Sequence, residues 1–102
     1  MEGLLRADLV VAHPFVTGEL SVGNLPDRRR KLEELVELPE AVLAHPSEVL
    51  ALIERQRLWS TGLGYIDAHL LASARLMGNV GLLTRDKRLA AAAERLGVGP
   101  TG

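Results

Sequence analysis

Two short apolar runs, far apart in the sequence with helical segments between them, constrain the fold most strongly. Residues 9–12 read LVVA and residues 80–84 read VGLLT. Both runs are apolar at successive positions, which is typical of strands covered on both faces. Short buried strands separated by helices predict an α/β layer fold with a parallel sheet, although a sheet of two or three strands is thin for a domain.

Turn and capping residues divide the rest of the chain into helical segments. Pro14 can open a helix, Asp27 and Ser47 are candidate N-caps, and Gly78 closes a helix. Residues 42–43 fit a brief extended piece. The expected helices cover residues 15–23, about 28–38, a segment after Ser47, 65–77 and about 87–96.

The composition fits one intracellular domain. At 102 residues the chain is too short for two stable cores, so residues 1–102 are expected to form a single domain. A net charge of −1 and one residue each of Trp, Tyr and Phe argue against a strongly basic nucleic-acid coat and against aromatic base-stacking platforms. The lack of cysteine excludes disulfides and cysteine-based zinc sites. With no leader-like start and no membrane-length apolar run, a cytoplasmic location is expected.

Two acidic residues fall where an amphipathic helix should be apolar. On a helical wheel, Asp67 lies inside the apolar arc of the helix at residues 65–77, and Glu19 lies inside that of the helix at residues 15–23. A carboxylate that faces a core needs a cation, a metal ion or several hydrogen bonds. The alternatives are that the dipole of the first helical turn stabilises Asp67, and that Glu19 faces solvent on a short helix.

Asp86 follows the strand expected at residues 80–84. Taken alone, it is most simply the N-cap of the next helix, but the carboxyl ends of parallel strands are also where α/β folds build their sites. Together with Glu19 and Asp67, it could converge on a hard divalent ion. Oxygen ligands suit Mg²⁺ or Mn²⁺, which can generate hydroxide for phosphodiester cleavage.

Three segments resemble the VapC family of PIN-domain ribonuclease toxins. Residues 13–20 (HPFVTGEL), followed by residues 23–25 (GNL), resemble the segment around the second conserved acid of that family. Residues 64–72 (GYIDAHLLA) and residues 83–89 (LTRDKRL) resemble the segments of its third and fourth acids. The order and spacing agree, and the likeness covers nearly the whole chain, from residue 4 to residue 99.

The resemblance implies a PIN-like parallel sheet flanked by helices, and a metal-dependent endoribonuclease of a type II toxin–antitoxin pair. It implies that Glu19, Asp67 and Asp86 bind Mg²⁺ or Mn²⁺, directly or through water, and that Thr84 hydrogen-bonds within the site. It further implies RNA as the substrate, a cognate antitoxin as a partner, and a homodimer.

The chain departs from the family at its start. Family members begin with a central strand that ends in Asp followed by Thr or Ser, and then a helix, whereas this chain starts after that point. The fold is therefore expected to be N-terminally truncated and to lack one ligand. Asp8 precedes its strand and does not replace the missing acid. The alternatives are an active nuclease, an inactive truncated module that binds an antitoxin or dimerises, and an unstable fragment.

The histidines and the basic residues give weaker signals. His13, His45 and His69 have no repeated metal-ligand spacing, and His69 is expected at the surface, on the polar side of its helix. The basic residues of segment 85–88 flank the proposed site. They either steer an RNA backbone or balance the neighbouring acids.

Overall fold

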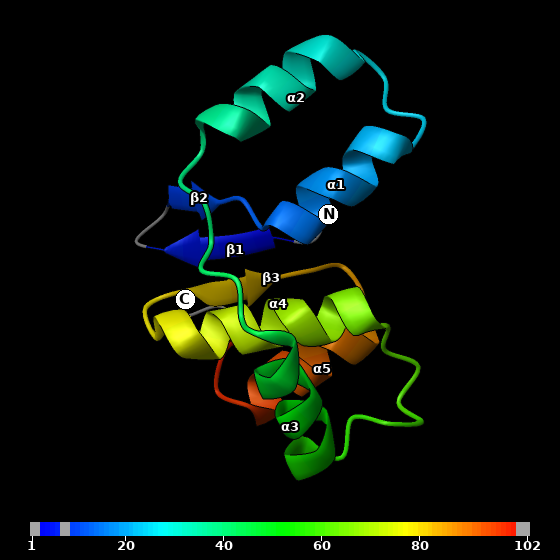
Figure 1. The fold of residues 1–102 in the computed structure, drawn as a ribbon, viewed down its shortest axis with the longest axis vertical. Coiled ribbons are helices and arrows are strands. Elements are labelled where there is room, and N and C mark those ends of the chain that lie inside the picture. The colour runs from blue at the N-terminus through cyan, green and yellow to red at the C-terminus, as the bar shows by residue number, and fades with distance from the viewer. Residues whose placement is uncertain (1–2, 7–8, 100–102) are drawn as a thin grey trace.

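The computed structural model describes residues 3–6 and 9–99, and these form an α/β arrangement (Figure 1). The elements in chain order are β1 (Gly3–Arg6), β2 (Leu9–Val11), α1 (Pro14–Val22), α2 (Arg28–Glu37), α3 (Pro46–Gln56), α4 (Tyr65–Met77), β3 (Gly81–Leu83) and α5 (Lys87–Arg95). The α/β class and both strands predicted from the sequence are confirmed. The predicted helices are also present, with ends that differ by one or two residues.

The three strands form a sheet of order β2-β1-β3 that is antiparallel, so the prediction of a parallel sheet is wrong for the described strands. β1 pairs with β2 through Leu4 and Val11 and with β3 through Leu4 and Leu82, in both cases antiparallel. Only two residues separate β1 from β2, whereas a parallel pair needs a crossover of about a dozen residues or more. β2 and β3 do run in the same direction, but β1 lies between them.

β1 is the strand that sequence patterning misses. It has four residues, too few to show a period. Leu4 is fully buried, and its partners Val11 and Leu82 on the neighbouring strands are each 1% exposed. Directly opposed residues of an antiparallel pair share a face, so these three side chains form one apolar row across the sheet. β1 is the central strand of the described sheet, and Leu4 is the middle residue of this apolar row.

α4 is the central helix of the fold. β1, β3 and α3 all pack against it, and every residue from Ala68 to Ala74 is buried. A helix that is covered on all sides does not have the polar face that the wheel predicted. The prediction that His69 lies at the surface is therefore wrong, because His69 is only 1% exposed.

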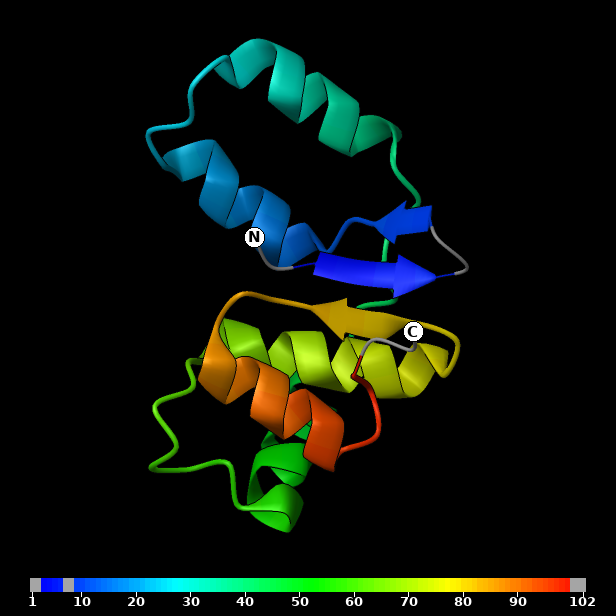
Figure 2. The same ribbon diagram turned by 180° about the vertical axis from the view of Figure 1, so that it is seen from behind.

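α1 and α2 pack on each other on the β2 side of the sheet, whereas α3, α4 and α5 gather on the β3 side (Figures 1 and 2). All residues of α1 and α2 are described, and none of them is buried. Val22 and Val36 are 83% and 78% exposed. This pair of helices, called the α1–α2 arm below, has few contacts that fix its orientation.

Two of the predicted N-caps are wrong. Asp27 precedes α2 with a φ of 56° and makes no capping hydrogen bond; its carboxylate pairs with Arg30 at 2.7 Å instead. α3 begins before Ser47, with His45 as its N-cap. His45 Nδ1 accepts a hydrogen bond from the backbone N–H of Ser47 at 3.1 Å, and Glu48 Oε1 accepts one from the backbone N–H of His45 at 2.9 Å. An imidazole nitrogen therefore takes the place of a hydroxyl oxygen in a capping box.

The extended piece expected at residues 42–43 lies slightly earlier. The N–H of Ala12 donates to the carbonyl of Pro39, and the N–H of Ala41 donates to the carbonyl of Ala12, both at 2.8 Å. This parallel bridge ties the segment after α2 to the end of β2. In the part of the chain that the structure describes, no helix is long and apolar enough to cross a membrane.

Candidate functional site

The turn between β3 and α5 holds two of the predicted site residues. Thr84 follows β3, and its Oγ1 accepts a hydrogen bond from the backbone N–H of Asp86 at 3.0 Å. Asp86 Oδ1 accepts hydrogen bonds from the backbone N–H groups of Arg88 and Leu89, at 2.8 and 3.2 Å. The predicted capping role of Asp86 is confirmed, and because both capping bonds use Oδ1, the cap does not need Oδ2.

Asp67 lies in the first turn of α4. Its Oδ2 accepts a hydrogen bond from the backbone N–H of Gly64 at 3.0 Å, and the residue is partly exposed. A carboxylate at a helix N-terminus is stabilised by the helix dipole and by the free N–H groups there. The geometry therefore matches the alternative in which the helix end, rather than an apolar core, surrounds Asp67.

Glu19 lies in the middle of α1 and is exposed. The alternative in which it faces solvent on a short helix therefore describes its surroundings better than a core position. Val16 and Leu20, its neighbours on α1, line the same pocket as Glu19. Glu19 is therefore an exposed acid that has apolar side chains of α1 beside it in the pocket.

A pocket of about 490 Å³ brings Glu19, Thr84 and Asp86 together. Asp67 does not line it, although the adjacent Ile66 does. Among the residues described, no three His, Cys, Asp or Glu side chains are grouped closely enough to hold a metal ion. The structure therefore unites two of the three predicted ligands and the predicted Thr84. The pocket is lined by Val16, Glu19, Leu20, Ile66, Thr84, Arg85 and Asp86.

The basic residues around this pocket differ in their surroundings. Arg85 lines the pocket. Arg88 lies over Gly62, where φ is +85° and an added Cβ would collide with the guanidinium. Arg85 is therefore better placed to meet a ligand than Arg88. Asp8, which the sequence excluded as a substitute ligand, lies outside the described residues.

Sequence reasoning missed a cluster of rings between α1 and α4, in which His13 and His69 are buried. The ring centroid of His69 lies 4.4 Å from that of Phe15 and 4.6 Å from that of Tyr65. Burial, and secondarily the neighbouring His69, lowers the pKa of His13 to about 4. Burial also lowers the pKa of His69. The available signal was the His-Pro dipeptide that starts at His13 and recurs at His45, since both histidines prove to be N-caps.

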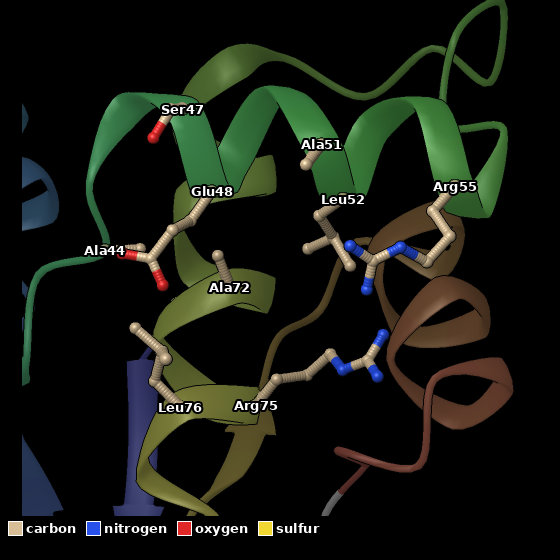
Figure 3. Close-up of a pocket in the computed structure, with 9 residues that line it drawn as sticks. All are labelled: Ala44, Ser47, Glu48, Ala51, Leu52, Arg55, Ala72, Arg75 and Leu76. Carbon is tan, nitrogen blue, oxygen red and sulfur yellow. The ribbon is translucent and has the colours of Figure 1, made fainter.

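A second pocket, of about 440 Å³, lies in the groove between α3 and α4 and contains none of the predicted site residues (Figure 3). The guanidinium groups of Arg55 and Arg75 lie toward each other at one end of this groove, and Glu48 lies at the other end. Ala51 and Ala72 are among the small residues between them. We call this region the α3–α4 groove.

Comparison with curated proteins finds Ribonuclease VapC32 of Mycobacterium tuberculosis, in strains CDC 1551 / Oshkosh and ATCC 25618 / H37Rv. It is 44% identical to this chain over 95 residues, which make up 93% of the chain and 77% of the relative. The chain belongs to the VapC family of PIN-domain toxins. No family model matches it, and no solved structure matches it significantly.

The relationship to VapC proteins confirms the resemblance read from the three segments. Because the match spans 93% of the chain, it takes in Glu19, Asp67 and Asp86. The name of the relative supports a nuclease.

Proposed function

We propose that this VapC protein is a metal-dependent endoribonuclease, the toxin of a type II toxin–antitoxin pair, which cleaves RNA phosphodiesters with a metal-activated water. The observation that carries the proposal is the pocket shared by Glu19, Thr84 and Asp86. These residues come from α1 and from the β3–α5 turn, two elements far apart in the sequence. The ribonuclease name of the relative supports the class of reaction.

The donor atoms of this pocket fit a hard divalent cation. Mg²⁺ is commonly held by one or two carboxylates and keeps several water ligands, so Glu19 and Asp86 suffice as direct ligands. Asp67 lies outside the pocket lining, so we assign it a ligand role through water. An ion of this kind, Mg²⁺ or Mn²⁺, supplies a water of lowered pKa and offsets charge on the phosphate.

The remaining groups of the pocket orient and surround these carboxylates. Thr84 holds the backbone of Asp86, and the first N–H groups of α5 hold Asp86 Oδ1, so the carboxylate has little freedom to rotate. Arg85 offers a guanidinium to an RNA phosphate. The apolar side chains of Val16 and Ile66 line the pocket beside these groups.

Cleavage of RNA by the purified protein tests this proposal. We expect cleavage to require Mg²⁺ or Mn²⁺, to stop when the ion is chelated, and to fall by at least ~10-fold in Asp67→Asn. Arg29→Gln, on the exposed α2, is the control and should cut as the wild type does. Cleavage that persists in a chelator, or that is equal in wild type and Asp67→Asn, would refute the proposal.

The alternative is a module that binds its antitoxin without cutting RNA. The lack of a three-residue metal cluster among the described residues favours it, as do Val22 and Val36 on the exposed α1–α2 arm. In that case the chain should co-purify with the antitoxin encoded beside it. It should then remain inactive toward RNA at every Mg²⁺ or Mn²⁺ concentration once the antitoxin is removed.

We also propose RNA as the substrate, a cognate antitoxin and a second copy of this chain as partners, and the cytoplasm as the compartment in which the toxin meets RNA. The α3–α4 groove supports self-association, because it carries opposite charges at its two ends (Figure 3). Glu48, Ala51 and Arg55 follow one another at i, i+3 and i+7, so they share one face of α3.

This face is self-complementary under a two-fold axis. Glu48 and Arg55 lie symmetrically about the middle of α3, next to Ala51, and are separated by ~10 Å along the helix. Two antiparallel α3 helices would therefore set Glu48 of one copy against Arg55 of the other, twice, with small alanines at the axis. Leu76, which is 49% exposed beside the groove, would be covered.

A further inference from the structure

His13 joins two elements that carry different parts of the proposed site. It is the N-cap of α1 and is 2% exposed. Its Nδ1 accepts a hydrogen bond from the backbone N–H of Phe15 at 3.1 Å, and its Nε2 lies 3.0 Å from Oγ of Ser73, in the middle of α4. One buried ring is therefore bonded both to the first turn of α1 and to the central helix.

The hydrogen bonds of His13 define its protonation state. Because Nδ1 accepts from a backbone N–H, a neutral ring carries its proton on Nε2, which donates to the Ser73 hydroxyl. The pKa of about 4 that results from burial keeps the ring neutral at physiological pH. The only titratable ring facing it is that of His69, at a centroid distance of 6.4 Å, among the described residues.

Ring packing also links α1 to α4. The ring of Phe15 packs edge-on against His69, and Val16 packs against the core. His69 Nδ1 is buried without a hydrogen-bond partner among the described residues, so His69 contributes packing here but no bond from that atom. No residue of α1 is buried, and the bond from His13 to Ser73 is a directional contact between the N-cap of α1 and α4.

We propose that His13 and Ser73 are positioning residues, whose hydrogen bond sets the distance from Glu19 on α1 to Asp86 on the far wall of the pocket. This inference rests on the proposed function, because the distance between Glu19 and Asp86 matters only if the two carboxylates hold the same ion. A ligand pair that must hold one ion needs its two carboxylates fixed in advance, and a tilt of α1 would separate them. Breaking the bond therefore loosens the α1–α2 arm and leaves the core around α4 in place.

Spin-label distances test whether the bond fixes α1. The natural chain has no cysteine, so Val22→Cys on α1 and Ala91→Cys on α5 provide the only labelling sites, and both positions are exposed. We expect Ser73→Ala to broaden the distribution of distances between these labels. A second pair, Leu50→Cys on α3 with Ala91→Cys, does not involve the arm and should stay narrow.

A matched pair of histidine variants separates positioning from capping alone. Asparagine is a good N-cap, so His13→Asn keeps the cap of α1 but is too short to reach Ser73. His45→Asn makes the same change at the N-cap of α3, where no such bond to α4 exists among the described residues. We expect His13→Asn to broaden the α1 to α5 distances and His45→Asn to leave them unchanged.

Binding of Mn²⁺ alone, followed by its electron paramagnetic resonance, provides a readout that does not depend on cleavage. We expect Ser73→Ala and His13→Asn to weaken Mn²⁺ binding by ~10-fold and to lower kcat more than they change KM. Unchanged label distances in Ser73→Ala, or broadened distances with unchanged Mn²⁺ affinity, would overturn the inference. If the wild type binds Mn²⁺ but cuts no RNA, the proposed function fails, while the distances and the Mn²⁺ affinity still decide the role of His13 and Ser73.

Discussion

Thr84 Oγ1 accepts a hydrogen bond from the backbone N–H of Asp86 at 3.0 Å, at the point where β3 turns into α5. Asp86 in turn caps α5 through Oδ1. The same carboxylate thus has a structural task, which uses one oxygen, and a proposed ligand task, which uses the other. Substitutions that separate the two tasks are the sharpest probes of this pocket.

Asp86→Asn should lose activity without losing the cap. Asn and Asp are about equally good N-caps, so we expect its free energy of unfolding to stay within ~0.5 kcal/mol of the wild-type value. RNA cleavage should fall by at least ~100-fold, because an amide is a poor ligand for Mg²⁺. Asp86→Ala should lose both the activity and about 1 kcal/mol of stability. Urea unfolding and cleavage assays measure these effects, and full activity in Asp86→Asn would exclude Asp86 as a ligand.

Glu19→Gln should weaken metal binding without affecting the fold. Glu19 is exposed, so its neutralisation should change the free energy of unfolding by less than ~0.5 kcal/mol. We expect the affinity for Mg²⁺ or Mn²⁺, measured by calorimetry, to fall ~10- to 100-fold. Glu34→Gln on the exposed α2 is the control and should bind the ion as the wild type does. Equal affinities in the two variants would remove Glu19 from the site.

The helices could be predicted from the sequence because their signals are local. The stretch from Tyr65 to Met77 and the cap at Asp86 are both where the sequence predicts them. The direction of the sheet could not be predicted, because it depends on β1, whose four residues carry no pattern. Once β1 joins the sheet, the two-residue connection to β2 makes their pairing antiparallel.

The pocket brings together Glu19, Asp86 and Thr84 but not Asp67, and the surroundings of these residues could not be predicted from the sequence. Glu19 and Asp67 seemed misplaced on wheels that assumed one apolar face, yet Glu19 is exposed and Asp67 lies at a helix end. His69 shows the opposite error, because Phe15, which comes from α1, packs against its ring and helps to bury a side that looks polar. Single-helix geometry cannot include the neighbours that decide burial.

Arg55→Glu should prevent self-association through the α3–α4 groove. In an antiparallel pair of α3 helices this change sets like charges against each other twice, so we expect the dimer Kd to rise by at least ~10-fold. Adding Glu48→Arg should restore the dimer, because it reverses both charges of each pair. Sedimentation equilibrium gives the Kd values.

Two controls accompany the charge reversal. Arg57→Glu, just after α3, lies outside the groove lining and should leave the Kd unchanged. Glu48 also belongs to the capping box at His45, so the thermal stability of the double variant must be measured alongside its Kd. A double variant that is folded but stays monomeric would contradict the pairing of Glu48 with Arg55.

Acid should destabilise the fold through His13. Its pKa is lowered from 6.5 to about 4 in the folded chain, so between these pH values the unfolded chain binds a proton that the folded chain resists. The stability is therefore complete above pH 6.5 and falls as the pH drops toward 4, by a total of about 3 kcal/mol. Protonation also ends the ability of Nδ1 to accept from the N–H of Phe15.

The comparison with His13→Asn isolates this contribution from that of the carboxylates, which titrate in the same range. Asparagine has no proton to gain, so the free energy of unfolding of the variant should depend less steeply on pH between 6.5 and 4. The burial of His69 lowers its pKa too, but His69 is present in both proteins. Urea unfolding at closely spaced pH values should therefore give curves that converge as the pH falls. Parallel curves would mean that His13 takes up its proton as readily in the folded chain as in the unfolded one.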